Sequence, residues 1–166
     1  LVVTLSIIYF LPFIFLCFGI LSSSISILVL SVLASFNYFM VYLANLINYP
    51  IERGIYHHFE KMAKDKLKSM SSLKIVGITG SYGKTSCKNI LNDILSVKFN
   101  SYATVKSINT FNGLMIAINN NLSKFDDVFI AEMGAYVKGE IHGLCELVNP
   151  KYGIITTIGT AHLSTF

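Results

Sequence analysis

The segment KIVGITGSYGKTSCKNILNDIL, residues 74–95, constrains the fold more than any other part of this 166-residue chain. An apolar run ends at Thr79, a loop containing Gly80 and Gly83 follows, and a helical pattern begins near Thr85. Because glycine reaches backbone angles that other residues avoid, successive N–H groups of such a loop can point inward. They then form an anion-binding nest beside the positive end of the helix. The segment therefore predicts a strand, a phosphate-binding loop and a helix.

Side chains in this loop are suited to a nucleoside triphosphate. Lys84 supplies a cation for the β and γ phosphates, and the Thr85 hydroxyl is placed to ligate Mg²⁺. The usual spacing would put a glycine at position 78, where this chain has Ile78. The alternative is an ordinary glycine-rich turn between a strand and a helix. The predicted nucleotide-binding residues of the loop are Gly80, Ser81, Tyr82, Gly83, Lys84, Thr85 and Ser86.

Strand and helix patterns alternate from residue 73 onward. The predicted helix at 85–97 carries Ile90, Leu91, Ile94 and Leu95 on one face. Strands separated by helices of about ten residues indicate right-handed βαβ units and a mainly parallel sheet. The fold class is therefore α/β, with strands predicted at 73–79, 101–104, 128–132 and 152–158, and further helices at 113–121 and 139–148.

Polar residues follow the predicted strands where ligands bind in parallel α/β sheets, outside the carboxyl ends. Glu132 ends the apolar run VFIAE, and a carboxylate there can hold Mg²⁺. Asn109 and Thr110 lie on a polar loop within reach of a γ phosphate or an acyl substrate. Taken alone, His162 after the last strand would ordinarily be a core or helix-capping histidine.

The first third of the chain has a different composition, with no Asp, Glu, Lys or Arg from Leu1 to Ile51. Apolar runs at 1–21 and 25–47 are each long enough to cross a bilayer. The sequence thus predicts a transmembrane helical hairpin over 1–49, which Pro50 ends. A basic helix or linker is predicted at 50–72, and it either lies on anionic lipid or is simply solvated. Its positive charge places the following domain, 73–166, in the bacterial cytoplasm at the cell membrane.

Four stretches together resemble one family. GITGSYGKTS is similar to the ATP-binding loop of the Mur ligases, the amide-bond-forming enzymes of peptidoglycan precursor synthesis. In the family's order follow SINTFNGL (107–114), AEMGAYVKGEI (131–141) and ITTIGTAHLSTF (155–166). The second of these is most similar to the branch of the family that adds D-alanyl-D-alanine. The resemblance covers 74–166, roughly the first half of the family's central ATPase domain.

The resemblance implies an ATP-dependent carbon–nitrogen ligase that uses ATP and Mg²⁺ and proceeds through an acyl phosphate. It implies metal ligation by Thr85, Glu132 and His162, with Lys84, Glu132 and His162 as the catalytic residues. The implied substrates are a UDP-muramoyl tripeptide, or a membrane-linked acyl acceptor, and D-alanyl-D-alanine. Further functional residues of the family would lie beyond Phe166, so we expect a truncated domain that is inactive by itself.

Two other functions remain open from the sequence. One is a different ATP-dependent ligase at the membrane, such as a poly-γ-glutamate synthase-like enzyme. The other is a non-catalytic nucleotide-binding membrane module. The combination of Lys84, Thr85, Glu132 and His162 favours an enzyme, because a scaffold does not need metal ligands.

Overall fold

The structure, a computed structural model, describes residues 37–159 together with Phe10, Ile14, Ser24, Ile25, Ile27, Leu28, Ser31 and Val32. The chain divides into two compact units, Leu1–His57 and His58–Phe166. The second unit contains the sheet and the phosphate loop.

A parallel sheet of four strands forms the centre of the second unit within the described residues, in the order β2-β3-β1-β4. The α/β fold and parallel sheet predicted from the sequence are confirmed. From β1 onward the element bounds differ from the predicted ones by a few residues at most, whereas α3 begins well before the helix predicted at 50–72. The elements are α3 (Asn37–Ser69), β1 (Lys74–Thr79), α4 (Lys84–Ser96), β2 (Ser101–Ala103), α5 (Phe111–Asn120), β3 (Val128–Glu132), α6 (Glu140–Val148) and β4 (Tyr152–Ile155).

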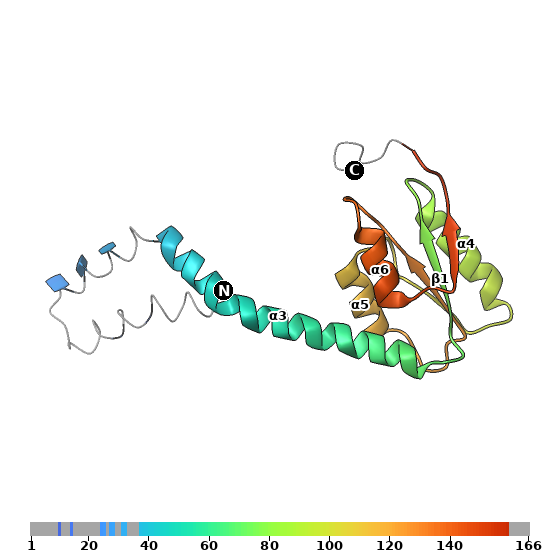
Figure 1. The fold of residues 1–166 in the computed structure, drawn as a ribbon, viewed down its shortest axis with the longest axis horizontal. Coiled ribbons are helices and arrows are strands. Elements are labelled where there is room, and N and C mark those ends of the chain that lie inside the picture. The colour runs from blue at the N-terminus through green and yellow to red at the C-terminus, as the bar shows by residue number, and fades with distance from the viewer. Residues whose placement is uncertain are drawn as a thin grey trace. The chain divides into compact units, whose positions relative to one another are not determined.

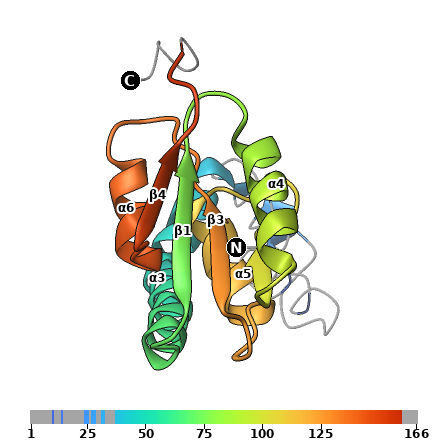
Figure 2. The same cartoon turned by 90° about the vertical axis from the view of Figure 1, so that its right-hand side faces the viewer.

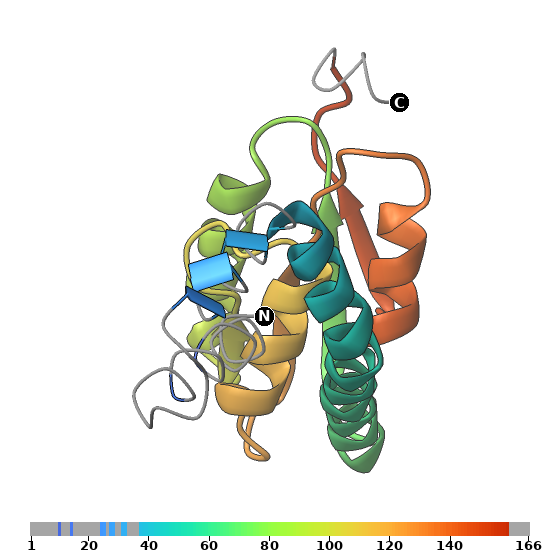
Figure 3. The ribbon, with the colours of Figure 1, turned by 90° about the vertical axis from the view of Figure 1, so that its left-hand side faces the viewer.

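Helices cover both faces of this sheet. Helix α4 lies on one face, and α5 and α6 lie on the other (Figure 1). Figure 2 shows β4, β1 and β3 side by side with α4 on the near face, and Figure 3 shows α5 and α6 from the opposite side. This arrangement follows from right-handed crossovers, because the chain moves across the sheet in one direction through α4 and in the other through α5 and α6.

The α4 face of the sheet buries alternate strand residues, as a sheet covered on both faces requires. Val76, Ile78, Val128 and Ile130 form a cluster there, packed by Cys87, Leu91 and Leu95 from the helix, among others. The prediction that Ile90 and Ile94 share this apolar face is wrong, since both are more than half exposed. The buried face of α4 instead runs through residues 87, 91 and 95, spaced at four.

Helix α3 is continuous through Pro50, so the prediction that this proline ends a helix is wrong. Proline removes one backbone hydrogen bond, and the neighbouring turns keep theirs. The C-terminal part of α3 belongs to the second unit. There Lys66 Nζ donates to the carbonyls of Ile118, at 2.7 Å, and Asn119, at 3.0 Å, near the end of α5. Burial lowers the pKa of Lys66, while Asp126 acts in the opposite direction.

The predicted localisation as a two-span membrane protein is corrected by the structure. None of the helices in the described part of the chain is both long and apolar enough to cross a membrane. Helix α3 includes the end of the predicted second span, but charged residues enter it from Glu52 onward. A membrane-spanning helix needs about 20 consecutive apolar residues. The predicted first span, 1–21, lies outside the described residues except for Phe10 and Ile14, and residues 26, 29–30 and 33–36 of the predicted second span also lie outside them.

We predict that Lys66→Met lowers the free energy of unfolding of the intact protein by about 1–2 kcal/mol, because two charge-assisted hydrogen bonds to α5 are lost. Chemical denaturation measures the change. Lys68→Met is the matched control, since Lys68 is exposed on the same helix turn. An equal loss in both variants would contradict the anchoring role of Lys66.

Candidate nucleotide-binding site

The phosphate loop joins β1 to α4 through two glycines with positive φ. Gly80 has φ 136°, and Gly83, which precedes the helix, has φ 78° and ψ 0°. Lys84 is the first residue of α4 and is partly buried. Its Nζ donates to the carbonyls of Gly80, at 2.6 Å, and Ser81, at 3.4 Å. The ammonium therefore lies across its own loop, as expected of a cation placed to meet phosphate oxygens.

The residues that follow β4 hold the outer side of this loop. The Ser81 N–H donates to the Thr157 carbonyl at 2.6 Å, and the Thr156 hydroxyl donates to the Tyr82 carbonyl at 2.7 Å. The Gly159 N–H donates to Ser81 Oγ at 3.0 Å. These bonds explain why β4 ends at Ile155 and not at 158, because the chain leaves the sheet to pair with the loop. Gly80 is required there, since a Cβ would lie 2.1 Å from Thr156 Oγ1.

Glu132 is the acid of the site, at the end of β3 and with only 1% of its side chain exposed. The Thr85 hydroxyl donates to its Oε1 at 3.2 Å, and Asn109 Nδ2 donates to the same oxygen at 3.3 Å. Gly134 allows the close approach of Asn109, because a Cβ there would lie 2.8 Å from the amide carbon. The structure thus brings together three of the predicted residues, Thr85, Asn109 and Glu132, beside Lys84.

Lys88 is a member of this cluster that the sequence reasoning missed. It is 1% exposed, and its Nζ lies 3.1 Å from Glu132 Oε2. That oxygen is buried and makes no hydrogen bond of good geometry, so the ion pair is its main polar contact. Its position in the helix could have indicated burial, because Lys88 lies one turn after Lys84 and about one turn before Leu91, which packs against the sheet.

The predicted contact Thr110 and the acid Glu140 line one small pocket together with Gly134. The Thr110 side chain caps α5, accepting from the Gly113 N–H at 3.3 Å. Glu140 starts α6 and accepts from the N–H groups of Tyr136, at 2.6 Å, and Val137, at 3.1 Å. These two bonds lower the pKa of Glu140. His162 lies outside the described residues.

The donors around Glu132 fit a magnesium ion. Mg²⁺ prefers oxygen ligands and commonly uses one or two protein groups, completing its shell with phosphate oxygens and water. Glu132 Oε1 and Thr85 Oγ1 are two such oxygens, 3.2 Å apart. Between residues 37 and 159 no three His, Cys, Asp or Glu side chains are grouped to hold a metal. The two oxygens of Glu132 and Thr85 suit an ion that completes its shell with phosphate oxygens and water.

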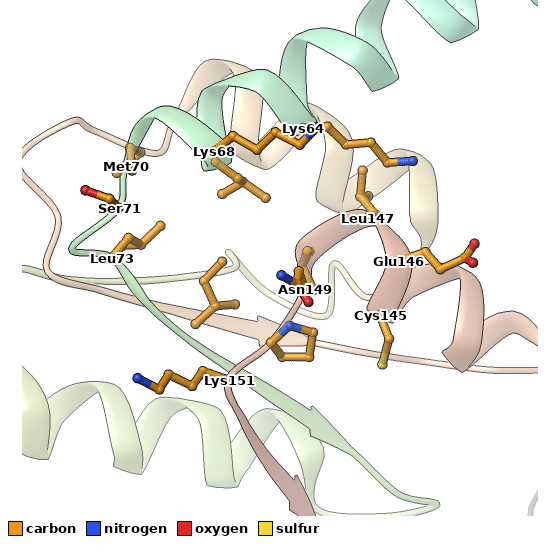
Figure 4. A pocket seen from close by; sticks show the side chains of 14 residues that line it. Lys64, Lys68, Met70, Ser71, Leu73, Cys145, Glu146, Leu147, Asn149 and Lys151 are labelled. Carbon is orange, nitrogen blue, oxygen red and sulfur yellow. The ribbon is translucent and has the colours of Figure 1, made fainter.

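A separate cleft of about 670 Å³ lies at the opposite, amino end of the strands. Figure 4 shows it among the end of α3, the start of β1 and the end of α6, with Lys64 and Lys151 on opposite sides. Both helices end there, so backbone carbonyls face this region. Leu73, Leu147 and Pro150 are among its apolar lining residues. The cleft is remote from the phosphate loop and has none of its residues.

The strand, phosphate loop and buried acid define a nucleotide-binding α/β domain. Residues 78–166 match the Mur ligase middle domain, and the chain belongs to this family.

The similar proteins and structures are much longer than this chain. It is 31% identical over 104 residues to the UDP-N-acetylmuramoyl-tripeptide--D-alanyl-D-alanine ligase of Bacillus subtilis, covering 63% of this chain and 22% of that protein. The enzyme of that name from Rickettsia prowazekii is 38% identical over 109 residues, covering 64% and 23%. The chain thus spans between about a fifth and a quarter of these relatives.

Solved structures agree in fold. MurF from Acinetobacter baumannii superimposes with a TM-score of 0.62 at 31% identity, covering 65% of this chain and 24% of that one. MurF from Thermotoga maritima, solved in complex with ADP, gives a TM-score of 0.60 at 34% identity, covering 64% and 25%.

We predict that Gly80→Ala destabilises the protein by about 3 kcal/mol, because the new Cβ adds steric overlap with Thr156 to an unfavourable backbone conformation. Gly83→Ala is the matched control. A Cβ at Gly83 meets nothing within 4 Å, so only the positive φ opposes it, at about 1–2 kcal/mol. Thermal unfolding of both variants measures the difference. A larger loss for Gly83→Ala would contradict the packing of Thr156 on the loop.

Proposed function

We propose that this chain carries the ATP-binding part of an amide-bond ligase that joins D-alanyl-D-alanine to a UDP-muramoyl tripeptide. The observation that carries the proposal is the direct contact between the phosphate-loop residue Thr85 and the buried carboxylate of Glu132, at 3.2 Å. A loop that only binds a nucleotide does not require a buried acid at that position. The reaction is the one that the similar proteins are named for, and the ADP complex of the Thermotoga maritima relative supports an adenine nucleotide as the ligand.

The proposed reaction has two steps. A carboxylate oxygen of the muramoyl peptide attacks the γ phosphorus of ATP, forming an acyl phosphate as the bond to ADP breaks. The amine of D-alanyl-D-alanine then attacks the acyl carbon, which forms the amide, releases inorganic phosphate and frees one proton. Both steps depend mainly on positioning and on neutralising phosphate charge.

The residues of the site have distinct roles in this proposal. Lys84 exchanges its contacts with the Gly80 and Ser81 carbonyls for oxygens of the β and γ phosphates. Thr85 and Glu132 would hold Mg²⁺, and the ion would supply positive charge that neutralises the phosphates. Asn109 keeps Glu132 Oε1 directed toward Thr85 through its amide. Thr110, at the edge of the site, stays a proposed contact for the nucleotide. His162, which lies outside the described residues, stays a proposed ligand of the metal.

We predict that the intact protein releases phosphate from ATP and Mg²⁺ only when UDP-muramoyl tripeptide and D-alanyl-D-alanine are supplied together. Lys84→Ala should lower this rate by about 100-fold or more, because a cation that stabilises the transferring phosphoryl group is removed. A phosphate-release assay with each substrate alone and with both measures the dependence. Lys124→Ala is the control, since Lys124 is an exposed lysine on the loop before β3, at the other end of the sheet.

The possible results separate the proposed ligase from the other functions. Release that requires both substrates and is lost in Lys84→Ala supports the ligase. Release with a different acid or amine would indicate another ATP-dependent ligase. ATP binding that Lys84→Ala abolishes, without any release, would leave a nucleotide-binding module and reject the proposed reaction.

A further inference from the structure

Lys88 is a buried cation inside the proposed site. Its side chain is 1% exposed, and its Nζ contacts only two groups in the described structure, Glu132 Oε2 at 3.1 Å and the carbonyl of Lys106. A charge so deeply buried is unfavourable unless it is paired and hydrogen-bonded. Breaking the ion pair with Glu132 in the folded domain would leave both charges buried without a partner, which is strongly unfavourable.

The second contact of Lys88 fixes the loop that brings in Asn109. Lys106 has φ 52°, a left-handed conformation that is unfavourable for a residue with a side chain. The ammonium of Lys88 bonds to the carbonyl of this residue. Asn109 follows three residues later and reaches Glu132 Oε1 at 3.3 Å. Lys88 thus connects α4, the end of β3 and the loop before α5 around one carboxylate.

The two oxygens of that carboxylate have different surroundings. Oε2 faces Lys88, whereas Oε1 faces the Thr85 hydroxyl and the Asn109 amide. The ion pair therefore leaves Oε1 as the oxygen on the side of the phosphate loop. It also gives the buried carboxylate a fixed counter-charge, so that Glu132 presents little net negative charge before a nucleotide binds.

We infer that Lys88 is a positioning residue that orients Glu132 and, by supplying its counter-charge, prevents a divalent cation from binding firmly before ATP. The inference rests on the proposed function, because it takes Glu132 as a ligand of the metal that accompanies ATP. The physical reason is that a divalent cation at Oε1 would lie near the Lys88 ammonium and be repelled by it. Only the added negative charge of the phosphates makes the site attractive to the metal.

Binding of Mn²⁺, followed by the paramagnetic resonance of the free ion, tests this inference on the intact protein without ATP. The chosen variants are Lys88→Met, which keeps most of the side-chain volume, and Lys88→Gln, which keeps a hydrogen-bond donor. We expect either variant to bind Mn²⁺ at least about tenfold more tightly than the unchanged protein, since the carboxylate has lost its counter-charge. The double variant Lys88→Met/Glu132→Gln should return to the weak binding of the unchanged protein.

A lysine with a purely structural role gives a different result. Variants that fold, as judged by circular dichroism, and bind Mn²⁺ within about twofold of the unchanged protein would overturn the inference. If neither single variant folds, recovery of folding in Lys88→Met/Glu132→Gln supports the inferred charge pair between Lys88 and Glu132. If the double variant also fails to fold, the inference is overturned.

The same titration repeated with protein in excess over ATP, and compared with ATP alone, tests the proposed function separately. The unchanged protein should then bind more Mn²⁺ than the same amount of ATP does without protein. Failure to do so would reject the proposed nucleotide site, whereas the titrations without ATP would still decide the role of Lys88 toward Glu132.

Discussion

The parallel pairing of β1 with β3 is the constraint on which the site depends. In this register Ile78 lies opposite Glu132, so the acid ends its strand beside the strand that leads into the phosphate loop. Val128 and Ile130 face α4, and Glu132, two residues further, points to the same face. It therefore meets Thr85 and Lys88 on the first turns of that helix. A slip of one residue would turn the carboxylate toward α5 and leave both partners without it.

Local chemistry explains why the sequence predicted much of this site. The glycines and the Lys84–Thr85 pair act over a few consecutive residues, and an acid after an apolar strand has a known place in a parallel sheet. Lys88 could not be recognised in this way. A lysine on a helix is ordinarily solvated, and the burial of this one depends on Glu132 and Lys106, which are distant in sequence. The exposure of Ile90 and Ile94 likewise depends on how α4 is rotated against the sheet.

The residues around Pro50 show the limit of composition as a guide. The absence of charge up to Ile51 and the proline at position 50 suggested that a helix ends there. Helix α3 instead runs continuously from Asn37 to Ser69, and its last turns bond to α5 through Lys66. Hydropathy cannot predict this contact, because the Lys66 ammonium bonds to backbone carbonyls of another helix. The last turns of α3 are therefore held to α5 by a tertiary contact.

The two lysines of α4 illustrate how one helix can provide cations of different kinds. Lys84 is only partly buried, and its partners are backbone carbonyls of its own loop, which water can solvate once it leaves. Moving the Lys84 ammonium from these carbonyls to a phosphate would therefore cost little free energy. Lys88 is enclosed and paired with an ionised partner, so moving it would leave a buried carboxylate alone. In the proposed function, Lys84 contacts the phosphates of the nucleotide, while Lys88, one helical turn away, stays paired with Glu132 beside it.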